Sequence, residues 1–363
     1  MDIQSAQDQI QELAQSGDPV FARLKITRIG MDNKHAAKTA LNALVQLDLQ
    51  GTSEHIVRLA KTHKECRPDA MMLLLEDQQM GAYSITELAQ CSEEDAYKAM
   101  STLLFHPEAN TYIPKILRSY PHLTEDMLDY LAPRKDEQAL SIIAGIGRQT
   151  SDEKTAQRAY DMIKSTGTSA SLLNMAEVAA GHDALAAQAV KDIRTAMRTT
   201  QFAYEHRDIV CEAVGYIALV AENPPMDEIM DVLAANKSSA SAFQLAAIGK
   251  HHKALSSRAL ENVIDVYENG LNAFYKDEAL QDIEKSIQDL ESVILDENTL
   301  EILLPETADA EQNQQTKKHL KTLFTRARDL VYQTVRDRNQ GFVAEMQMQS
   351  LTRFQPEFTP DDF

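Results

Sequence analysis

A segment of 23 residues that occurs twice constrains the fold of this chain more than any other feature. Residues 125–147 align without a gap with residues 227–249, and seven of the 23 positions are identical. The identical pairs are Asp129/Asp231, Leu131/Leu233, Ala132/Ala234, Lys135/Lys237, Ala144/Ala246, Ile146/Ile248 and Gly147/Gly249. Self-similarity of this kind is typical of a chain built by stacking one supersecondary unit. The repeat therefore indicates an architecture before it indicates any activity.

The spacing of apolar residues within each copy predicts two short helices. Met127, Leu128 and Leu131 fall three and four residues apart, and Leu140 and Ile143 continue the pattern after a polar break. This spacing puts the apolar side chains on one face of each helix. A single pair of such helices cannot bury its apolar face alone, so neighbouring pairs must cover it. We therefore predict an all-α fold, an α-solenoid of HEAT- or armadillo-like helix pairs.

Weaker copies extend the repeat along most of the chain. Residues 84–104 hold a third copy, in which Leu88-Ala89 matches Leu131-Ala132 at a distance of 43 residues. Looser copies of the Leu-Ala pair occur at Leu59-Ala60 and, as Val-Ala, at Val178-Ala179. The intervals of about 43 to 55 residues favour a HEAT or armadillo unit of about 40 to 47 residues. We expect residues 1–304 to form a right-handed superhelical array.

Two proline-led runs carry a resemblance to known repeat families. Pro121-His-Leu-Thr-Glu-Asp-Met-Leu128 and Pro224-Pro-Met-Asp-Glu-Ile-Met230 each lead into Leu-Ala. They resemble the HEAT-like and leucine-rich-variant repeats of bacterial proteins, over about residues 52–250. The resemblance implies a helical repeat fold. One branch of the leucine-rich-variant proteins holds an iron–sulfur cluster on an additional cysteine cluster, which this chain lacks, so we expect no cofactor and no metal site.

The composition favours a helical protein with an acidic surface. Apolar residues make up 44% of the chain and aromatic residues 6%, with no tryptophan, and the formal net charge is −19. Such a charge repels nucleic acid and anionic membranes from most of the surface. Because the chain is acidic along its length up to residue 316, its charge disfavours a nucleic-acid partner.

The cysteines and the N-terminus indicate the cellular compartment in which the protein is expected. Cys66, Cys91 and Cys211 are odd in number and far apart, which is typical of a reducing compartment. The chain begins without the basic and apolar regions of a signal peptide. No apolar run approaches the ~20 residues that cross a bilayer. We expect a cytoplasmic protein without a transmembrane segment, with export as an effector as the alternative.

The C-terminal part of the chain changes its charge. We expect a linker at 305–315, a basic amphipathic helix at 316–350 and a flexible tail at 351–363. The helix is expected either to cap the acidic array or to dock an acidic partner, a nucleic acid or a membrane surface. The tail is expected either to fray or to act as a short recognition motif. The residues concerned are Lys317, Lys318, Lys321, Arg326, Arg328, Arg336 and Arg338 in the helix, and Phe354, Phe358 and Phe363 in the tail.

A binding scaffold is the function that these features favour. The curved wall of a solenoid is expected to hold a protein or peptide, through exposed helix positions such as Lys98, Ser141 and Gln244. An enzyme is the competing class, because His182-Asp183 is similar to the dipeptide of metal-dependent HD phosphohydrolases. That chemistry would require further His or Asp ligands beside His182. A third class is nucleic-acid or acidic-partner binding through the basic helix.

Overall fold

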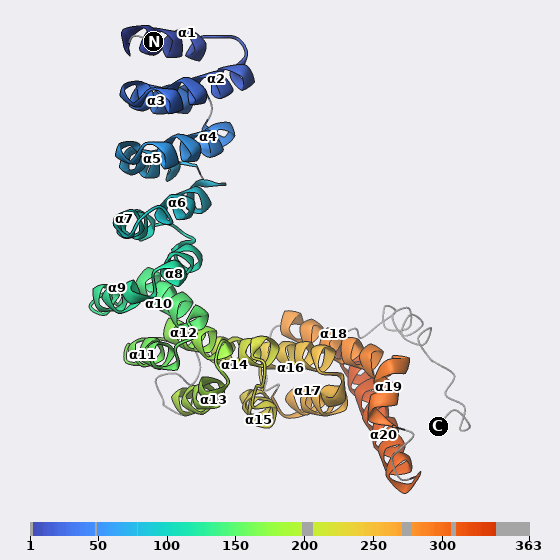
Figure 1. Cartoon of the computed structure of the whole chain (residues 1–363). Helices are drawn as coiled ribbons and strands as arrows, with labels where there is room; N and C mark the ends of the chain where they lie inside the picture. The colour runs from blue at the N-terminus through green and yellow to red at the C-terminus, as the bar shows by residue number, and fades with distance from the viewer. Residues whose placement is uncertain are drawn as a thin grey trace. The chain divides into compact units, whose positions relative to one another are not determined.

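The protein is an all-helical chain in two compact units. The computed structural model describes residues 3–47, 49–77, 79–197, 206–270, 277–305 and 310–338, and all regular structure within these ranges is helical. Unit 1 is Met1–Gly167 and unit 2 is Thr168–Phe363 (Figure 1). Helices pack in both units against helices that are close in sequence, which confirms the prediction of an all-α, solenoid-like fold. No helix in the described ranges is both long and apolar enough to cross a bilayer.

Unit 1 is a stack of helix pairs in two layers (Figure 1). Each first-layer helix packs against the next first-layer helix along the chain, and α1 (Ile3–Ala14) packs against the first pair. The first-layer helices are α2 (Pro19–Asp32), α4 (Leu49–Thr62), α6 (Gly81–Ala89), α8 (Ala109–Ser119) and α10 (Glu137–Gln149). The second-layer helices are α3 (Ala37–Leu47), α5 (Arg67–Leu74), α7 (Glu93–Leu103), α9 (Thr124–Leu131) and α11 (Glu153–Lys164).

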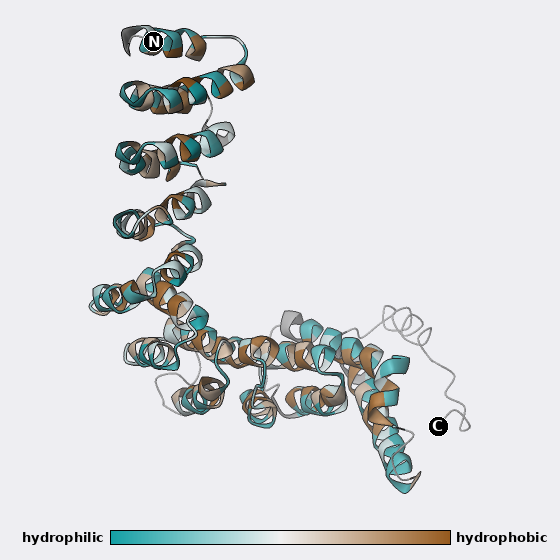
Figure 2. Ribbon diagram, viewed as in Figure 1, coloured by the Kyte–Doolittle hydropathy of each residue, from teal (hydrophilic) through white to brown (hydrophobic). Residues whose placement is uncertain are grey.

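Several helices of unit 1 begin at a side-chain cap. Ser92, Asp136 and Asp152 each accept a hydrogen bond from the backbone N–H three residues later, at the starts of α7, α10 and α11. Hydrophobic and hydrophilic residues alternate along each helix, so that each helix carries both kinds (Figure 2), and the buried residues of these helices are mostly apolar. A β-carbon at Gly145 in α10 would overlap the carbonyl oxygen of Asn110 in α8. Glycine at this position therefore lets two first-layer helices pack closely.

Unit 2 repeats the two-layer arrangement and adds helices at its C-terminal end. Its first-layer helices are α12 (Ser169–Ala180), α14 (Arg207–Val220), α16 (Ser239–His251) and α18 (Asp277–Ile294). Its second-layer helices are α13 (Asp183–Met197), α15 (Met226–Asn236) and α17 (Ser256–Gly270). They are followed by α19 (Glu297–Leu303) and α20 (Ala310–Arg338), and α20 packs against α17 and α18.

The two sequence copies occupy equivalent positions in the two units. Residues 125–147 lie in α9 and α10, and residues 227–249 lie in α15 and α16. Leu131 and Leu233 each end the apolar face of a second-layer helix, and both are 0% exposed. The structural equivalence of the copies confirms the internal repeat on which the prediction of the fold rested.

The period of the repeat is shorter than predicted. First-layer helices of unit 1 begin at Pro19, Leu49, Gly81, Ala109 and Glu137, which are 28 to 32 residues apart. The predicted unit of about 40 to 47 residues was wrong because the Leu-Ala pair from which it was inferred ends helices of both layers. The pair ends first-layer helices at Leu59 and Leu88, but second-layer helices at Leu131 and Leu233. The third copy, 84–104, consequently runs from the first layer to the second, whereas 125–147 runs from the second to the first.

The C-terminal helix starts earlier than expected. α20 begins at Ala310, inside the segment 305–315 that was expected to be a linker, and its described part ends at Arg338. Leu320, Leu323, Phe324, Ala327 and Val331 are buried, so the predicted apolar face packs against unit 2. Residues 306–309 and 339–363 lie outside the described part, and so does the expected tail.

Candidate binding surfaces

The three positions predicted as partner contacts do not share one surface, and only Lys98 is exposed, whereas Ser141 and Gln244 are half-buried. Lys98 is on α7 in the second layer of unit 1, where its ammonium donates to Glu94 at 2.7 Å. Ser141 is on α10 in the first layer of unit 1, and Gln244 is on α16 in the first layer of unit 2. The Gln244 side chain lies over Gly215 of α14, where a β-carbon would overlap its amide. Each is therefore a separate surface position.

The basic residues of α20 divide into engaged and exposed groups. Arg326 donates from Nη2 to Asp265 at 2.7 Å and from Nε to Glu268 at 2.8 Å, both on α17. These contacts raise the pKa of Arg326 and lower that of Glu268. Lys318, Lys321 and Arg328 are exposed, whereas Lys317 is half-buried. Through Arg326, α20 thus makes an ionic contact with α17 of unit 2.

The side chains of five predicted contact residues lie outside the described part of the structure. They are Arg336 and Arg338 at the end of α20, and Phe354, Phe358 and Phe363 in the expected tail.

His182 and Asp183 lie at the junction between α12 and α13. The Asp183 carboxylate accepts from the backbone N–H of Asn223 at 3.2 Å and from its side-chain amide at 2.6 Å. Across the described residues, no three His, Cys, Asp or Glu side chains are grouped as a metal site would require. The ligand set that the HD phosphohydrolase alternative needs beside His182 is therefore not found among them.

The charges of unit 1 are separated between its two layers, although the sequence reads as acidic throughout. Helices α2, α4, α6, α8 and α10 carry eight basic and four acidic residues, a net charge of +4. Helices α3, α5, α7, α9 and α11 carry six basic and nine acidic residues, a net charge of −3. The expectation of a uniformly acidic array was wrong for unit 1. We call the exposed side of its first-layer helices the basic face; its polar and aromatic residues include Arg58, Lys61, Tyr83, Tyr112, Lys115 and Arg118.

A hydrogen-bonded group joins α4 to α6 on the basic face. Lys61 donates from Nζ to Glu87 at 2.8 Å, and the Tyr83 hydroxyl donates to the other carboxylate oxygen of Glu87 at 3.3 Å. These contacts lower the pKa of Glu87, with the hydrogen bond from Lys61 as the largest cause. The Tyr83 ring is 48% exposed. Glu87 therefore positions an aromatic ring that solvent still reaches.

A second aromatic group lies on the neighbouring helix α8. Burial and then the charge of Glu108 raise the pKa of Tyr112, with a smaller contribution from Tyr83. Lys115 Nζ is 4.5 Å from the centroid of the Tyr112 ring, a cation–π distance. Arg118, one turn further, donates to Gln149 of α10 at 2.7 Å. Lys115 and Arg118 form no ion pair in the described part of the chain, so their charges are open to a partner.

The N-terminal end of the basic face is apolar. Val20, Phe21 and Leu24 of α2 are 62%, 49% and 55% exposed. Lys25 Nζ lies 5.4 Å from the Phe21 ring centroid. Large exposed apolar side chains on one helix mark a surface suited to protein contacts.

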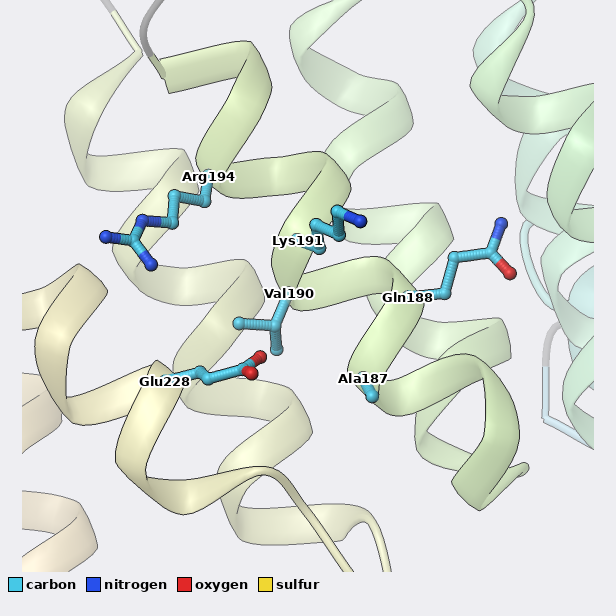
Figure 3. Close-up of a pocket in the computed structure, with 6 residues that line it drawn as sticks. All are labelled: Ala187, Gln188, Val190, Lys191, Arg194 and Glu228. Carbon is cyan, nitrogen blue, oxygen red and sulfur yellow. The ribbon is translucent and has the colours of Figure 1, made fainter.

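The described part of unit 2 contains an open groove between two second-layer helices. It has a volume of about 580 Å³ and is lined by Ala187, Gln188, Val190, Lys191 and Arg194 of α13 and by Glu228 of α15. In Figure 3, the Glu228 carboxylate points to the Val190 side chain, Arg194 extends to the left above them, and Lys191 and Gln188 extend to the right. The groove therefore offers cations and one carboxylate around an apolar floor.

Neither surface was predicted from the sequence, but a signal for the first was present. Arg58 and Lys61, like Lys115 and Arg118, are three residues apart, which places each pair on one side of a helix. Their alignment depends on which helices share a layer, and that is set by the period of about 30 residues. Counting charge along the chain averages the two layers and hides the pattern.

Comparison with known proteins adds little. No protein-family model and no curated protein matches this chain. A crystal structure of an engineered protein aligns with 89% of this chain and 99% of its own length, at 14% identity and a TM-score of 0.34. A structure from the computational design of self-assembling cyclic homooligomers aligns with 91% and 97%, at 16% identity and a TM-score of 0.15. With TM-scores this low, the likeness carries no argument about this protein.

Proposed function

We propose that this protein is a non-catalytic scaffold that binds an acidic segment of a partner protein along the basic face of unit 1. The observation that carries the proposal is the pair of aromatic rings, Tyr83 and Tyr112, beside Lys115 and Arg118, two cations that form no ion pair with the described residues. Tyrosine and arginine are enriched where protein interfaces gain most of their binding energy. Stacked repeats present such residues on an extended surface.

The distribution of charge favours a peptide over a polyanion. The first-layer helices of unit 1 carry four carboxylates among their eight cations, and Glu87 lies directly beside Tyr83. A nucleic-acid backbone would meet these carboxylates at regular intervals, whereas a protein segment can place an acidic residue against a cation and a polar one against Glu87.

The length of the bound segment follows from helix packing. Adjacent packed helices lie about 8 to 10 Å apart, so α2, α4, α6 and α8 span about 24 to 30 Å. An extended chain covers this distance in about eight residues at ~3.3 Å per residue. The exposed apolar residues of α2 would hold an apolar side chain at one end of that segment.

The proposal is tested with a fluorescein-labelled peptide of about ten residues, rich in Glu and Asp with one terminal Leu, by fluorescence anisotropy on the full chain. We expect saturable binding that weakens with salt, because the contacting charges are exposed. Lys115→Glu with Arg118→Glu should weaken binding about tenfold or more, equivalent to about 1.4 kcal/mol. The matched control is Lys135→Glu with Lys154→Glu, which makes the same charge change at exposed sites off the basic face.

Three outcomes would contradict the proposal. The first is no binding of the acidic peptide, and the second is an equal loss in the control variant. The third is tighter binding of a single-stranded oligonucleotide of similar charge than of the peptide, which would assign the face to nucleic acid.

A further inference from the structure

At two junctions, one in each unit, an arginine of a second-layer helix pairs with two carboxylates of the preceding second-layer helix. Arg158 of α11 pairs with both Glu125 and Asp129 of α9. Arg258 of α17 pairs with two carboxylates of α15, and its Nη2 lies 3.1 Å from Asp231. In each case one guanidinium crosses to two carboxylates four residues apart on the preceding second-layer helix. We call this contact the arginine clamp.

The junction between α13 and α15 lacks the clamp, as the register of buried residues shows. The buried pair Leu185-Ala186 of α13 corresponds to Met127-Leu128 of α9 and to Ile229-Met230 of α15. This register places Ala187 where the clamped carboxylates Asp129 and Asp231 stand in the other helices.

The arginine of the clamp is replaced as well. The buried pair Ile229-Met230 also corresponds to Ala159-Tyr160 of α11 and to Ala259-Leu260 of α17, each of which directly follows the clamp arginine. Glu228 therefore stands where Arg158 and Arg258 stand at the closed junctions. A carboxylate has replaced the guanidinium, and a methyl group has replaced a carboxylate.

The exchange leaves an open groove with unpaired cations. Lys191 and Arg194 are exposed on α13 and form no ion pair within the described ranges. Val190 is buried beneath them, and Ala187 lies one turn away. Two cations and the single carboxylate of Glu228 give the groove a net charge of +1, which matches a monoanion. A dianionic phosphate would be repelled by Glu228, whereas a carboxylate leaves it free to accept a peptide N–H.

We propose that the groove between α13 and α15 is a second binding site, which accepts a glutamate or aspartate side chain of a partner peptide against Arg194. The partner's carboxylate takes the role of the acidic group that Ala187 lacks. A planar guanidinium can bind a carboxylate through two parallel hydrogen bonds, which fixes the orientation of the bound side chain. An apolar neighbour of that residue packs on Ala187 and Val190. This site uses no residue of the basic face and stands without it.

The test uses the full chain with methyl-labelled Ala and Val, followed by NMR. The probe is a capped peptide of sequence Ala-Leu-Glu-Leu-Ala, compared with versions carrying Gln or phosphoserine in place of Glu. We expect the Glu peptide to shift the methyl signals of Ala187 and Val190, and the Gln peptide to bind about tenfold more weakly or not at all. Arg194→Gln should remove the same binding, while Lys285→Gln, at an exposed position of α18, should leave it unchanged.

A second variant is designed to close the groove with the same arginine clamp that joins second-layer helices at the two other junctions. Ala187→Asp with Glu228→Arg rebuilds an arginine clamp, so it should abolish binding of the Glu peptide while the fold is retained. Equal shifts from the Glu and Gln peptides, or full binding by the Arg194→Gln chain, would overturn the proposal. Tighter binding of the phosphoserine peptide would overturn the assignment to a carboxylate. Lys115→Glu with Arg118→Glu should not affect this binding, which separates the test from that of the basic face.

Discussion

Replacing Leu131 or Leu233 with alanine should destabilise the helices around each residue by similar amounts. Both side chains are 0% exposed at the same position of a second-layer helix. Truncating a fully buried leucine removes its transfer free energy and leaves a cavity, at a cost of about 3 to 5 kcal/mol. The loss should stay local, because helices of a stacked array contact only their neighbours.

Hydrogen–deuterium exchange of the full chain measures this effect helix by helix. Leu131→Ala should speed exchange in α8 to α11, and Leu233→Ala should do so in α14 to α17. A loss of about 3 kcal/mol raises the population of the locally open state, and with it the rate of exchange, by about a hundredfold. Tyr130→Ala is the matched control, since Tyr130 is 54% exposed beside Leu131. The reasoning is refuted if Tyr130→Ala has the same effect, or if Leu131→Ala speeds exchange equally in α14 to α17.

Three further predictions concern α20, a buried carboxylate and the thiols. Arg326→Ala should destabilise α20 by about 1 kcal/mol, a figure that allows for solvent screening of its partly exposed ion pairs, and should speed hydrogen exchange in that helix. Burial raises the pKa of Glu291 to about 7. The free energy of unfolding should therefore fall by up to about 3 kcal/mol as the pH rises from about 4.5 to 7. Glu291→Gln should remove this pH dependence. Cys91, which is half-exposed, should react with a thiol reagent before Cys66 and Cys211, because both of these are buried. Burial raises the pKa of both thiols, and it raises that of Cys211 to about 12.

The sign of the Glu291 prediction follows from proton binding. In the unfolded chain this carboxyl group loses its proton near its ordinary pKa of 4.5, whereas in the folded chain it keeps the proton up to about pH 7. The folded state therefore binds more protons in this range, and raising the pH favours unfolding. If the free energy of unfolding rises between pH 4.5 and 7, and Glu291→Gln removes that rise, the result would contradict the burial of this carboxyl group. Unchanged exchange in α20 of Arg326→Ala, or labelling of Cys211 before Cys91, would contradict the other two predictions.

The sequence was sufficient to predict the fold class, because burial imposes a pattern on it. Leu131 and Leu233 repeat with their neighbours because both end the apolar face of a second-layer helix. The period could not be read from the same landmarks, since Leu-Ala pairs also end first-layer helices such as α4 and α6. Helices of both layers bury one face, so their apolar patterns are alike. Only the contacts between helices show to which layer a helix belongs.

The candidate surfaces depend on contacts between helices that the sequence does not specify. Tyr83 and Tyr112 are 29 positions apart and become neighbours only because α6 packs against α8. The groove in unit 2 is recognised by the absence of an arginine clamp, and that clamp joins residues about 30 positions apart. By contrast, the apolar face of α20 was predictable because its period lies within one helix.

The central claim is that a partner segment lies on the first-layer helices of unit 1. Hydrogen–deuterium exchange of the full chain, with and without the acidic peptide, tests this claim most directly. We predict slower exchange in α6 and α8, around Tyr83 and Tyr112, with no change in α7 or α9. Protection confined to α20, or no protection in any first-layer helix at a peptide concentration that saturates the anisotropy signal, would contradict the claim.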